Sequence, residues 1–210
     1  MKTEVNKVKF WTPLRLACTV IAFGLLAAFG VSSCNSNDPS SNPASANRPG
    51  ATPNRAGMTT LSQPILQAEN RATSGAPIKL GDYSGKVLFV NLWATWCGPC
   101  RLETPELVKL HKEFHAQGLE VVGLSTENAE DSAENVREFV HNYNVDYRVG
   151  WSGPEVAIAL MQGRDAIPQS FIISRDGRVV KRFIGFNPIS TPEQIREAVQ
   201  EALNQKSAAD

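Results

Sequence analysis

The strongest constraint on the fold comes from two apolar runs on either side of a helical pattern. Residues 86–93 (KVLFVNLW) and 119–125 (LEVVGLS) are almost entirely apolar and have the length of strands, as expected for strands covered on both faces. Residues 98–116 place apolar side chains mostly three or four positions apart, which predicts a helix with one buried face. A strand, a helix and a strand with short links form a parallel pair with a right-handed crossover. The sequence therefore predicts an α/β domain.

The residues that follow this unit predict an inserted helix and strand. A helix is expected at 132–143, where the pattern DSAE beginning at Asp131 offers a capping box. A short strand at 145–149 and a short helix at 154–161 come next.

The C-terminal part predicts an antiparallel addition to the sheet. Runs 170–174 and 178–184 read as two strands, and the Asp-Gly turn between them predicts a hairpin. Thr191, Pro192 and Gln194 supply the N-cap, first-turn and capping-box residues of a closing helix. The expected architecture is a mixed central sheet flanked by helices on both faces.

The N-terminus has the order of an export signal. Lysines and Arg15 precede an apolar run at 16–31, and the residues VSSC that end at Cys34 resemble the lipobox of bacterial lipoproteins. We expect residues 1–34 to be a signal peptide with Cys34 as the lipidated residue, with an uncleaved signal anchor as the alternative. Both place the rest of the chain outside the cytoplasm, anchored to a membrane of the bacterial cell envelope.

A polar segment follows the presumed signal. Residues 35–56 contain no Val, Ile, Leu or aromatic residue, so they cannot bury enough apolar surface to offset the entropy of ordering. Pro64 interrupts the weak apolar pattern that comes next. We expect a disordered linker over 35–75 and a folded domain over 76–210. The formal net charge of zero gives no basic footprint for nucleic acid.

Cys97 and Cys100 form a C-x-x-C pair, which is compatible with a metal site, a structural disulfide or a redox dithiol. His111 and His115 complete a spacing close to that of zinc fingers. In a continuous helix, however, Cys100 and His111 are about 16 Å apart, too far to share an ion. A structural disulfide is also a weak explanation, because so short a loop removes little unfolded-state entropy. We therefore expect no metal at this pair, and disulfide exchange, the remaining alternative, requires neither a metal nor an organic cofactor.

The placement of the pair favours redox chemistry. Cys97 ends a buried strand and precedes a helix, where free backbone N–H groups and the positive end of the helix dipole stabilise a thiolate. Pro99 fits the first helical turn, and Cys100, one turn on, is expected to face inward.

Three segments carry a resemblance to a known family: KLGDYSGKVLFV, NLWATWCGPCRLETPEL and AIPQSFIISRDGRVV. Together they resemble membrane-tethered thiol-disulfide oxidoreductases of the TlpA/ResA type, in the thioredoxin superfamily. The likeness covers about residues 76–205, and the helix and strand at 132–149 are similar to the extra element of this branch. It implies a thioredoxin-like fold.

The resemblance also implies roles for individual residues. Cys97 matches the nucleophile, and Cys100 matches the resolving cysteine of a redox-active disulfide. Ile167 and Pro168 match a cis-proline motif that binds the substrate backbone, and Trp96 matches an aromatic residue beside the cysteines.

One position departs from cytoplasmic thioredoxins, which have a buried Asp where this chain has Asn91. Asn cannot accept a proton, and some members of the branch have an acidic residue where Glu103 stands. Glu103 is the candidate proton acceptor for Cys100, with a plain solvent-facing residue as the alternative. Glu127 is a weaker candidate.

The expected function is reduction of disulfides in exported proteins, with apocytochrome c as one family client. The resemblance implies a membrane thiol-transfer protein as the reductant, and the domain is expected to act as a monomer. An oxidase or isomerase on the same fold and a non-catalytic binding module are the alternatives. The Gly-Pro pair between the cysteines favours a reductase, because reducing thioredoxins share it.

Overall fold

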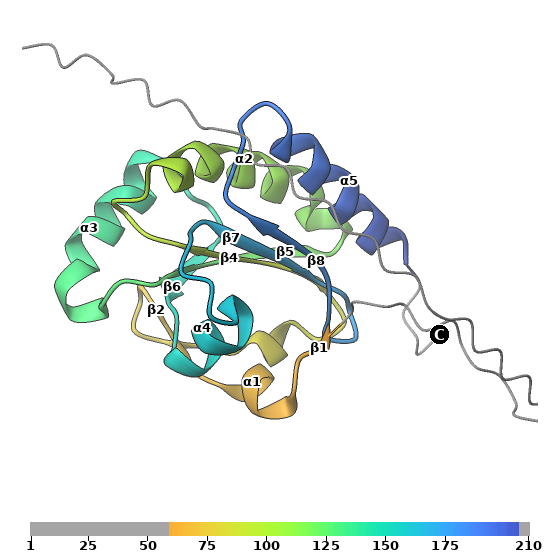
Figure 1. Cartoon of the computed structure of the whole chain (residues 1–210), viewed down its shortest axis with the longest axis horizontal. Coiled ribbons are helices and arrows are strands. Elements are labelled where there is room, and N and C mark those ends of the chain that lie inside the picture. Colours follow the sequence, from red (N-terminus) through yellow and green to blue (C-terminus); the bar gives the residue numbers. More distant parts are fainter. Residues whose placement is uncertain (1–58, 206–210) are drawn as a thin grey trace, which may run out of the picture. The chain divides into compact units, whose positions relative to one another are not determined.

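A mixed sheet organises residues 59–205, the part of the chain that the computed structural model describes (Figure 1). Its eight strands lie in the order β1-β8-β7-β4-β5-β6-β2-β3. Their bounds are β1 (Thr59–Thr60), β2 (Asn70–Ala72), β3 (Pro77–Ile78), β4 (Val87–Trp93), β5 (Leu119–Ser125), β6 (Arg148–Trp151), β7 (Gln169–Ile173) and β8 (Arg178–Ile184). The central strands β4, β5 and β6 are parallel, β7 pairs with β4 in antiparallel fashion, and β8 pairs with β7 in antiparallel fashion. The predicted mixed sheet and C-terminal hairpin are confirmed.

Helices cover both faces of this sheet. Their bounds are α1 (Gln63–Gln67), α2 (Gly98–Phe114), α3 (Ala129–Asn142), α4 (Pro154–Met161) and α5 (Thr191–Asn204), with 3₁₀ turns at Leu80–Tyr83 and His115–Gln117. Figure 1 shows α2 and α5 on one face, α1 and α4 on the other, and α3 beyond the β6 side. Among residues 59–205, no helix is both long enough and apolar enough to cross a bilayer.

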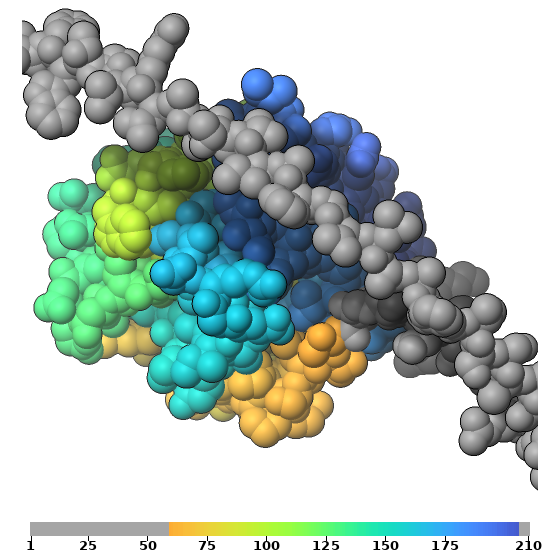
Figure 2. Space-filling model, viewed as in Figure 1, coloured from red at the N-terminus to blue at the C-terminus, as the bar shows by residue number. Residues whose placement is uncertain are grey.

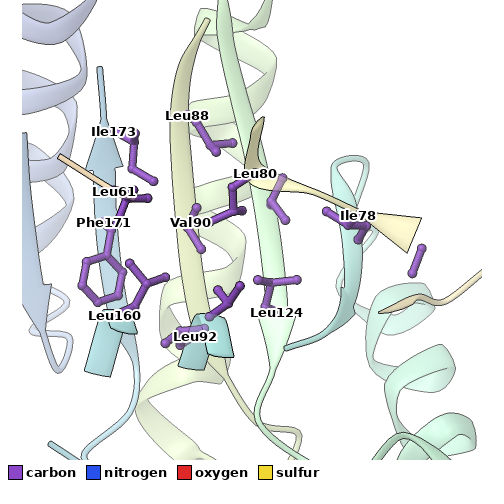
Figure 3. Packing of buried hydrophobic residues seen from close by; sticks show 13 residues of the cluster. Leu61, Ile78, Leu80, Leu88, Val90, Leu92, Leu124, Leu160, Phe171 and Ile173 are labelled. Atoms are coloured by element: carbon purple, nitrogen blue, oxygen red, sulfur yellow. The ribbon is translucent and has the colours of Figure 1, made fainter. Parts of the chain in front are cut away.

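Strand β4 separates two parts of the core, because successive side chains of a strand point to opposite faces. Leu88, Val90 and Leu92 pack with residues of α4 and β7 on one face (Figure 3). Val87 and Phe89 pack against apolar residues of α2 and α5 on the other. Burial on both faces explains why this strand reads as a continuous apolar run.

The folded domain begins earlier than the sequence predicts. Residues 59–75 were expected to belong to the linker, yet they contain β1, α1 and β2. Pro64 does not prevent a helix here, because it occupies the first turn of α1, where its missing N–H is not needed. Leu61 is buried in the core, and α1 lies beside α4, as the orange and cyan surfaces show (Figure 2).

Strand β2 reaches the sheet through a close approach to β6. A Cβ atom on Gly150 would lie 2.2 Å from the carbonyl oxygen of Arg71, so the pairing of the two strands requires glycine there. The Asn70 side chain also accepts a hydrogen bond from the Gly153 backbone N–H at 2.8 Å. The predicted signal peptide, Cys34 and linker residues 35–58 lie outside the described residues.

Three predicted boundaries differ from those of the structure. Helix α3 begins at Ala129, because the Asn128 side chain accepts the backbone N–H groups of Glu130 and Asp131; Asp131 is therefore not the cap. Strand β6 covers Arg148–Trp151, not 145–149. Helix α5 starts at Thr191 itself, so Thr191 is the first helical residue instead of the cap.

Candidate active site

The loop after β4 places Cys97 at the N-terminus of α2. Cys97 is the N-cap residue, and its Sγ accepts the Cys100 backbone N–H at 3.2 Å. Pro99 lies in the first turn of the helix. Backbone donors and the positive end of the helix dipole thus face the Cys97 sulfur, and they stabilise a thiolate once the residue is reduced.

Cys97 and Cys100 form a disulfide with an S–S distance of 2.03 Å. The two residues are 3% and 1% exposed, respectively, and they pack with Trp93, Val136 and Phe139. Cys100 therefore faces the interior, and the part of Cys97 that solvent reaches is small. A reacting partner must approach this sulfur closely along the surface of the loop.

The segment before β7 lies against the disulfide, although it is 70 residues away along the chain. The Ile167–Pro168 peptide bond is cis. The carbonyl oxygen of Ile167 lies 3.7 Å from Cys97 Sγ. A Cys97 thiol has this carbonyl within reach as an acceptor.

Glu103 is buried beneath the disulfide loop, at 1% exposure, so the solvent-facing alternative for this residue is wrong. It stands three residues after Cys100, on the same helix. One carboxylate oxygen accepts a hydrogen bond from Asn91 Nδ2 and the other accepts one from Ser170 Oγ, both at 2.8 Å. Asn91 also donates to Ser170 Oγ at 3.0 Å. Strands β4 and β7 thereby hold the side chain of an α2 residue.

The surroundings of Glu103 favour its protonated form. Burial raises the pKa of Glu103 to about 7, and the hydrogen bonds from Ser170 and Asn91 lower it by less. Both hydrogen-bond donors are uncharged, so neither of them brings a positive charge to a carboxylate at this position. A carboxyl group with such a pKa exchanges a proton readily near neutral pH.

Ser170 was not predicted from the sequence, although it is the direct cross-strand partner of Asn91 in the β4–β7 pairing. The register of this strand pair is the only feature that links Ser170 to the site. Tyr147, next to β6, was missed as well. Burial and then the charge of Glu103 raise the pKa of Tyr147, whose hydroxyl forms a hydrogen bond with Thr104.

Glu127 lies on the other side of the loop and anchors it. Its carboxylate accepts the backbone N–H and the hydroxyl of Thr95, each at 2.7 Å, and the Ser125 hydroxyl at 3.0 Å. These contacts fix the residue that precedes Trp96. Within the described part of the chain, the hydrogen bonds of Glu127 are with Thr95 and Ser125, and none is with either cysteine.

Trp96 projects from this loop and is 69% exposed. It lines a groove of about 660 Å³ together with Arg101, Phe139 and Tyr143. Arg101 Nε donates to the Thr95 carbonyl at 2.9 Å, which holds one wall of the groove. The groove runs between the start of α2 and the inserted helix α3, next to the cysteine pair.

The histidines do not join the cysteines. His111 belongs to the last turn of α2 and His115 follows it, at the end of the helix opposite Cys97. Within the described residues, the group suited to a metal ion consists of His111, His115 and Glu120.

Comparisons with known proteins match this arrangement. The model of the Redoxin family matches residues 56–199. The chain belongs to the Redoxin family. Among curated relatives, the thiol-disulfide oxidoreductase ResA of Bacillus thuringiensis is 34% identical over 111 residues, covering 53% of this chain and 62% of ResA. ResA of Bacillus subtilis is 36% identical over 118 residues, covering 54% and 61%. This Redoxin-family chain thus spans about three-fifths of the length of these relatives.

A solved structure shows the same fold for this Redoxin-family chain. It is that of a putative thiol:disulfide interchange protein DsbE from Chlorobium tepidum, with a TM-score of 0.57 at 27% identity. The match covers 65% of this chain and 93% of that one. The resemblance to the ResA type and the thioredoxin-like fold are confirmed.

Proposed function

We propose that the protein is a thiol-disulfide oxidoreductase that reduces disulfides in exported proteins through Cys97 and Cys100. The observation that carries the proposal is the Cys97–Cys100 disulfide at the N-terminus of α2, with Cys97 Sγ 3.7 Å from the Ile167 carbonyl. Similarity to ResA and DsbE proteins supports the same chemistry.

The reaction starts from the reduced dithiol. The Cys97 thiolate attacks one sulfur of a client disulfide; that S–S bond breaks, a mixed disulfide with Cys97 forms, and the other client sulfur leaves as a thiolate. Cys100 then attacks Cys97 Sγ, which restores the Cys97–Cys100 disulfide and releases the client as a dithiol. Two electrons pass from the protein to the client, so an external thiol donor must reduce the pair again.

Glu103 is the proton acceptor in this scheme. Cys100 must lose its proton before it attacks, and Glu103 lies buried one helical turn beyond it. With a pKa of about 7, a carboxylate at this position takes a proton from a thiol without binding it too tightly to release it. Asn91 and Ser170 orient the carboxylate through their hydrogen bonds.

The client binds across the loop surface. Ile167 and Pro168 present backbone to an extended peptide beside Cys97, and Trp96 offers an exposed ring for an apolar side chain next to the client cysteine. Apocytochrome c is one client of this kind, and a membrane thiol-transfer protein is the reductant. Attachment through Cys34 or an N-terminal anchor would hold this monomeric domain on the outer side of a membrane, as the N-terminal sequence pattern indicates.

The first test is the reduction potential of the Cys97/Cys100 pair in the full chain, kept in mild detergent. Cys18 and Cys34 are alkylated beforehand while the disulfide is intact. A potential near thioredoxin's value of about −270 mV supports a reductase. A potential near about −120 mV contradicts it and assigns a disulfide donor, and unreactive thiols would indicate a binding module.

A variant pair tests the two cysteine roles. Cys100→Ala should accumulate a mixed disulfide with a disulfide-bonded peptide, because nothing releases the client from Cys97. Cys97→Ala should accumulate none. Equal trapping by both variants would contradict the assignment of Cys97 as nucleophile.

A further inference from the structure

Two histidines and a carboxylate meet at the end of α2 that lies away from the cysteines. His111 and His115 are one helical turn apart, and their ring centroids are 4.7 Å apart. Glu120 reaches them from β5, and His115 Nδ1 lies 3.7 Å from Glu120 Oε1. Candidate ligand atoms of the three residues all lie within 4.8 Å of one another.

This donor set suits a divalent transition-metal ion. Imidazole nitrogen and carboxylate oxygen are ligands that Zn²⁺ takes at about 2.0–2.1 Å, so neighbouring ligands of a tetrahedral ion lie about 3.3 Å apart. The His115–Glu120 separation is already close to that spacing. Side-chain rotation brings the remaining atoms closer. The His115 side chain is 55% exposed and has room to rotate, a rotation that would exchange the contact of its Nδ1 with the Leu119 carbonyl oxygen, at 3.3 Å, for the ion.

Two further features favour a cation at this position. His111 Nδ1 lies 3.2 Å from Asp146 Oδ1, and a histidine that donates Nδ1–H to a carboxylate presents its Nε2 lone pair to a metal. The group also lies at the C-terminal end of α2, where the helix dipole is negative. Two carboxylates, Glu120 and Asp146, therefore accompany the two imidazoles.

We propose that His111, His115 and Glu120 bind one divalent transition-metal ion of the Zn²⁺ type, with Asp146 orienting His111. Three protein ligands leave a fourth position for water or an external ligand. The ion would tie the end of α2 to the start of β5. Because the ligands differ from Cys97 and Cys100, binding does not depend on the proposed oxidoreductase activity and occurs while the disulfide is intact.

The test measures zinc binding to the full chain in mild detergent, without a histidine tag. Free thiols are alkylated and the Cys97–Cys100 disulfide is kept oxidised, so that no cysteine competes for the ion. Competition with a chromophoric chelator gives the stoichiometry and the dissociation constant. We expect one Zn²⁺ per chain. His115→Ala and Glu120→Gln should each weaken binding at least about tenfold, and Asp146→Asn by about tenfold.

The third histidine of the chain supplies the control. His141 is exposed on α3 and is not one of the three candidate ligands, so His141→Ala should leave zinc affinity unchanged. His115 is exposed as well, so loss of binding in His115→Ala does not come from loss of the fold; an unchanged urea-unfolding midpoint without zinc verifies this. Absence of zinc binding, binding that survives His115→Ala, or equal losses in His115→Ala and His141→Ala would overturn the proposal.

Discussion

Two carboxylates flank the Cys97–Cys100 loop, and the groups that surround them differ. Glu103 is fully buried and accepts hydrogen bonds only from the neutral side chains of Asn91 and Ser170. Glu127 is half-buried and accepts a backbone N–H and two hydroxyl groups. Both are well supplied with hydrogen bonds, so the number of hydrogen bonds does not distinguish them.

Burial and position distinguish the two residues. Glu103 follows Cys100 by one helical turn and is poised to exchange a proton near neutral pH. Glu127 holds Thr95, and so sets the path of the chain into Trp96 and Cys97. One loop thus combines two acids in different surroundings: a buried one beneath it whose pKa is raised to about 7, and one that fixes its backbone.

The largest expected effect is on the pH dependence of stability. Native Glu103, with a pKa of about 7, keeps its proton between pH 4.5 and 7, whereas the unfolded chain loses it near 4.5. Stability relative to Glu103→Gln should therefore fall by about 3 kcal/mol as the pH rises through this range, and stay constant above it. Urea unfolding of the oxidised protein at pH 4 to 8 measures the difference.

Ser170→Ala sharpens this measurement. The Ser170 hydrogen bond lowers the pKa of Glu103, so its removal should extend the loss of stability to higher pH, while the onset near pH 4.5 stays where the unfolded chain sets it. A difference between the wild-type protein and Glu103→Gln that does not change with pH would show that Glu103 does not titrate in this way.

The next effect is on the rate at which Cys100 resolves the mixed disulfide. Gln cannot accept a proton, so Glu103→Gln should slow this step at pH 7 at least about tenfold. Rapid-mixing measurement of peptide release from a preformed mixed disulfide reports it directly. Glu106→Gln, on the same helix and paired with Lys109, is the matched control. Equal rates for Glu103→Gln and the wild-type protein would remove Glu103 from the mechanism.

The smallest effect belongs to Glu127. Glu127→Gln should lower stability by about 1 kcal/mol, because a charged acceptor of the Thr95 N–H and hydroxyl is replaced by a neutral one. Hydrogen exchange at the Thr95 amide should become faster. Unchanged protection of that amide would show that Glu127 does not hold the loop.

The sequence was sufficient for the parts of the fold that depend on local pattern. The apolar runs of β4 and β5 and the helical pattern of α2 are contiguous, and their periodicity predicts each element and its face. The placement of Cys97 at a helix N-terminus follows from the same contiguity.

The features that were missed depend on pairing between distant segments. Ser170 joins Glu103 only because the β4–β7 register places it opposite Asn91. The role of residues 70–72 depends on Gly150, since a strand can dock there only where no side chain intervenes. The burial of Glu103 needs the neighbouring strands β4 and β7 beneath α2, and helical spacing alone leaves its face undetermined.

Residues 59–72 form strands toward both ends of the strand order of the sheet. β1 pairs with β8 on one side, and after α1 the chain reaches β6 on the other side as β2. A fragment begun at residue 76 would therefore leave the backbone N–H and C=O groups of β8 and β6 without these partners. Exposed strand edges recruit other chains, so this short segment protects the domain against aggregation through its own sheet.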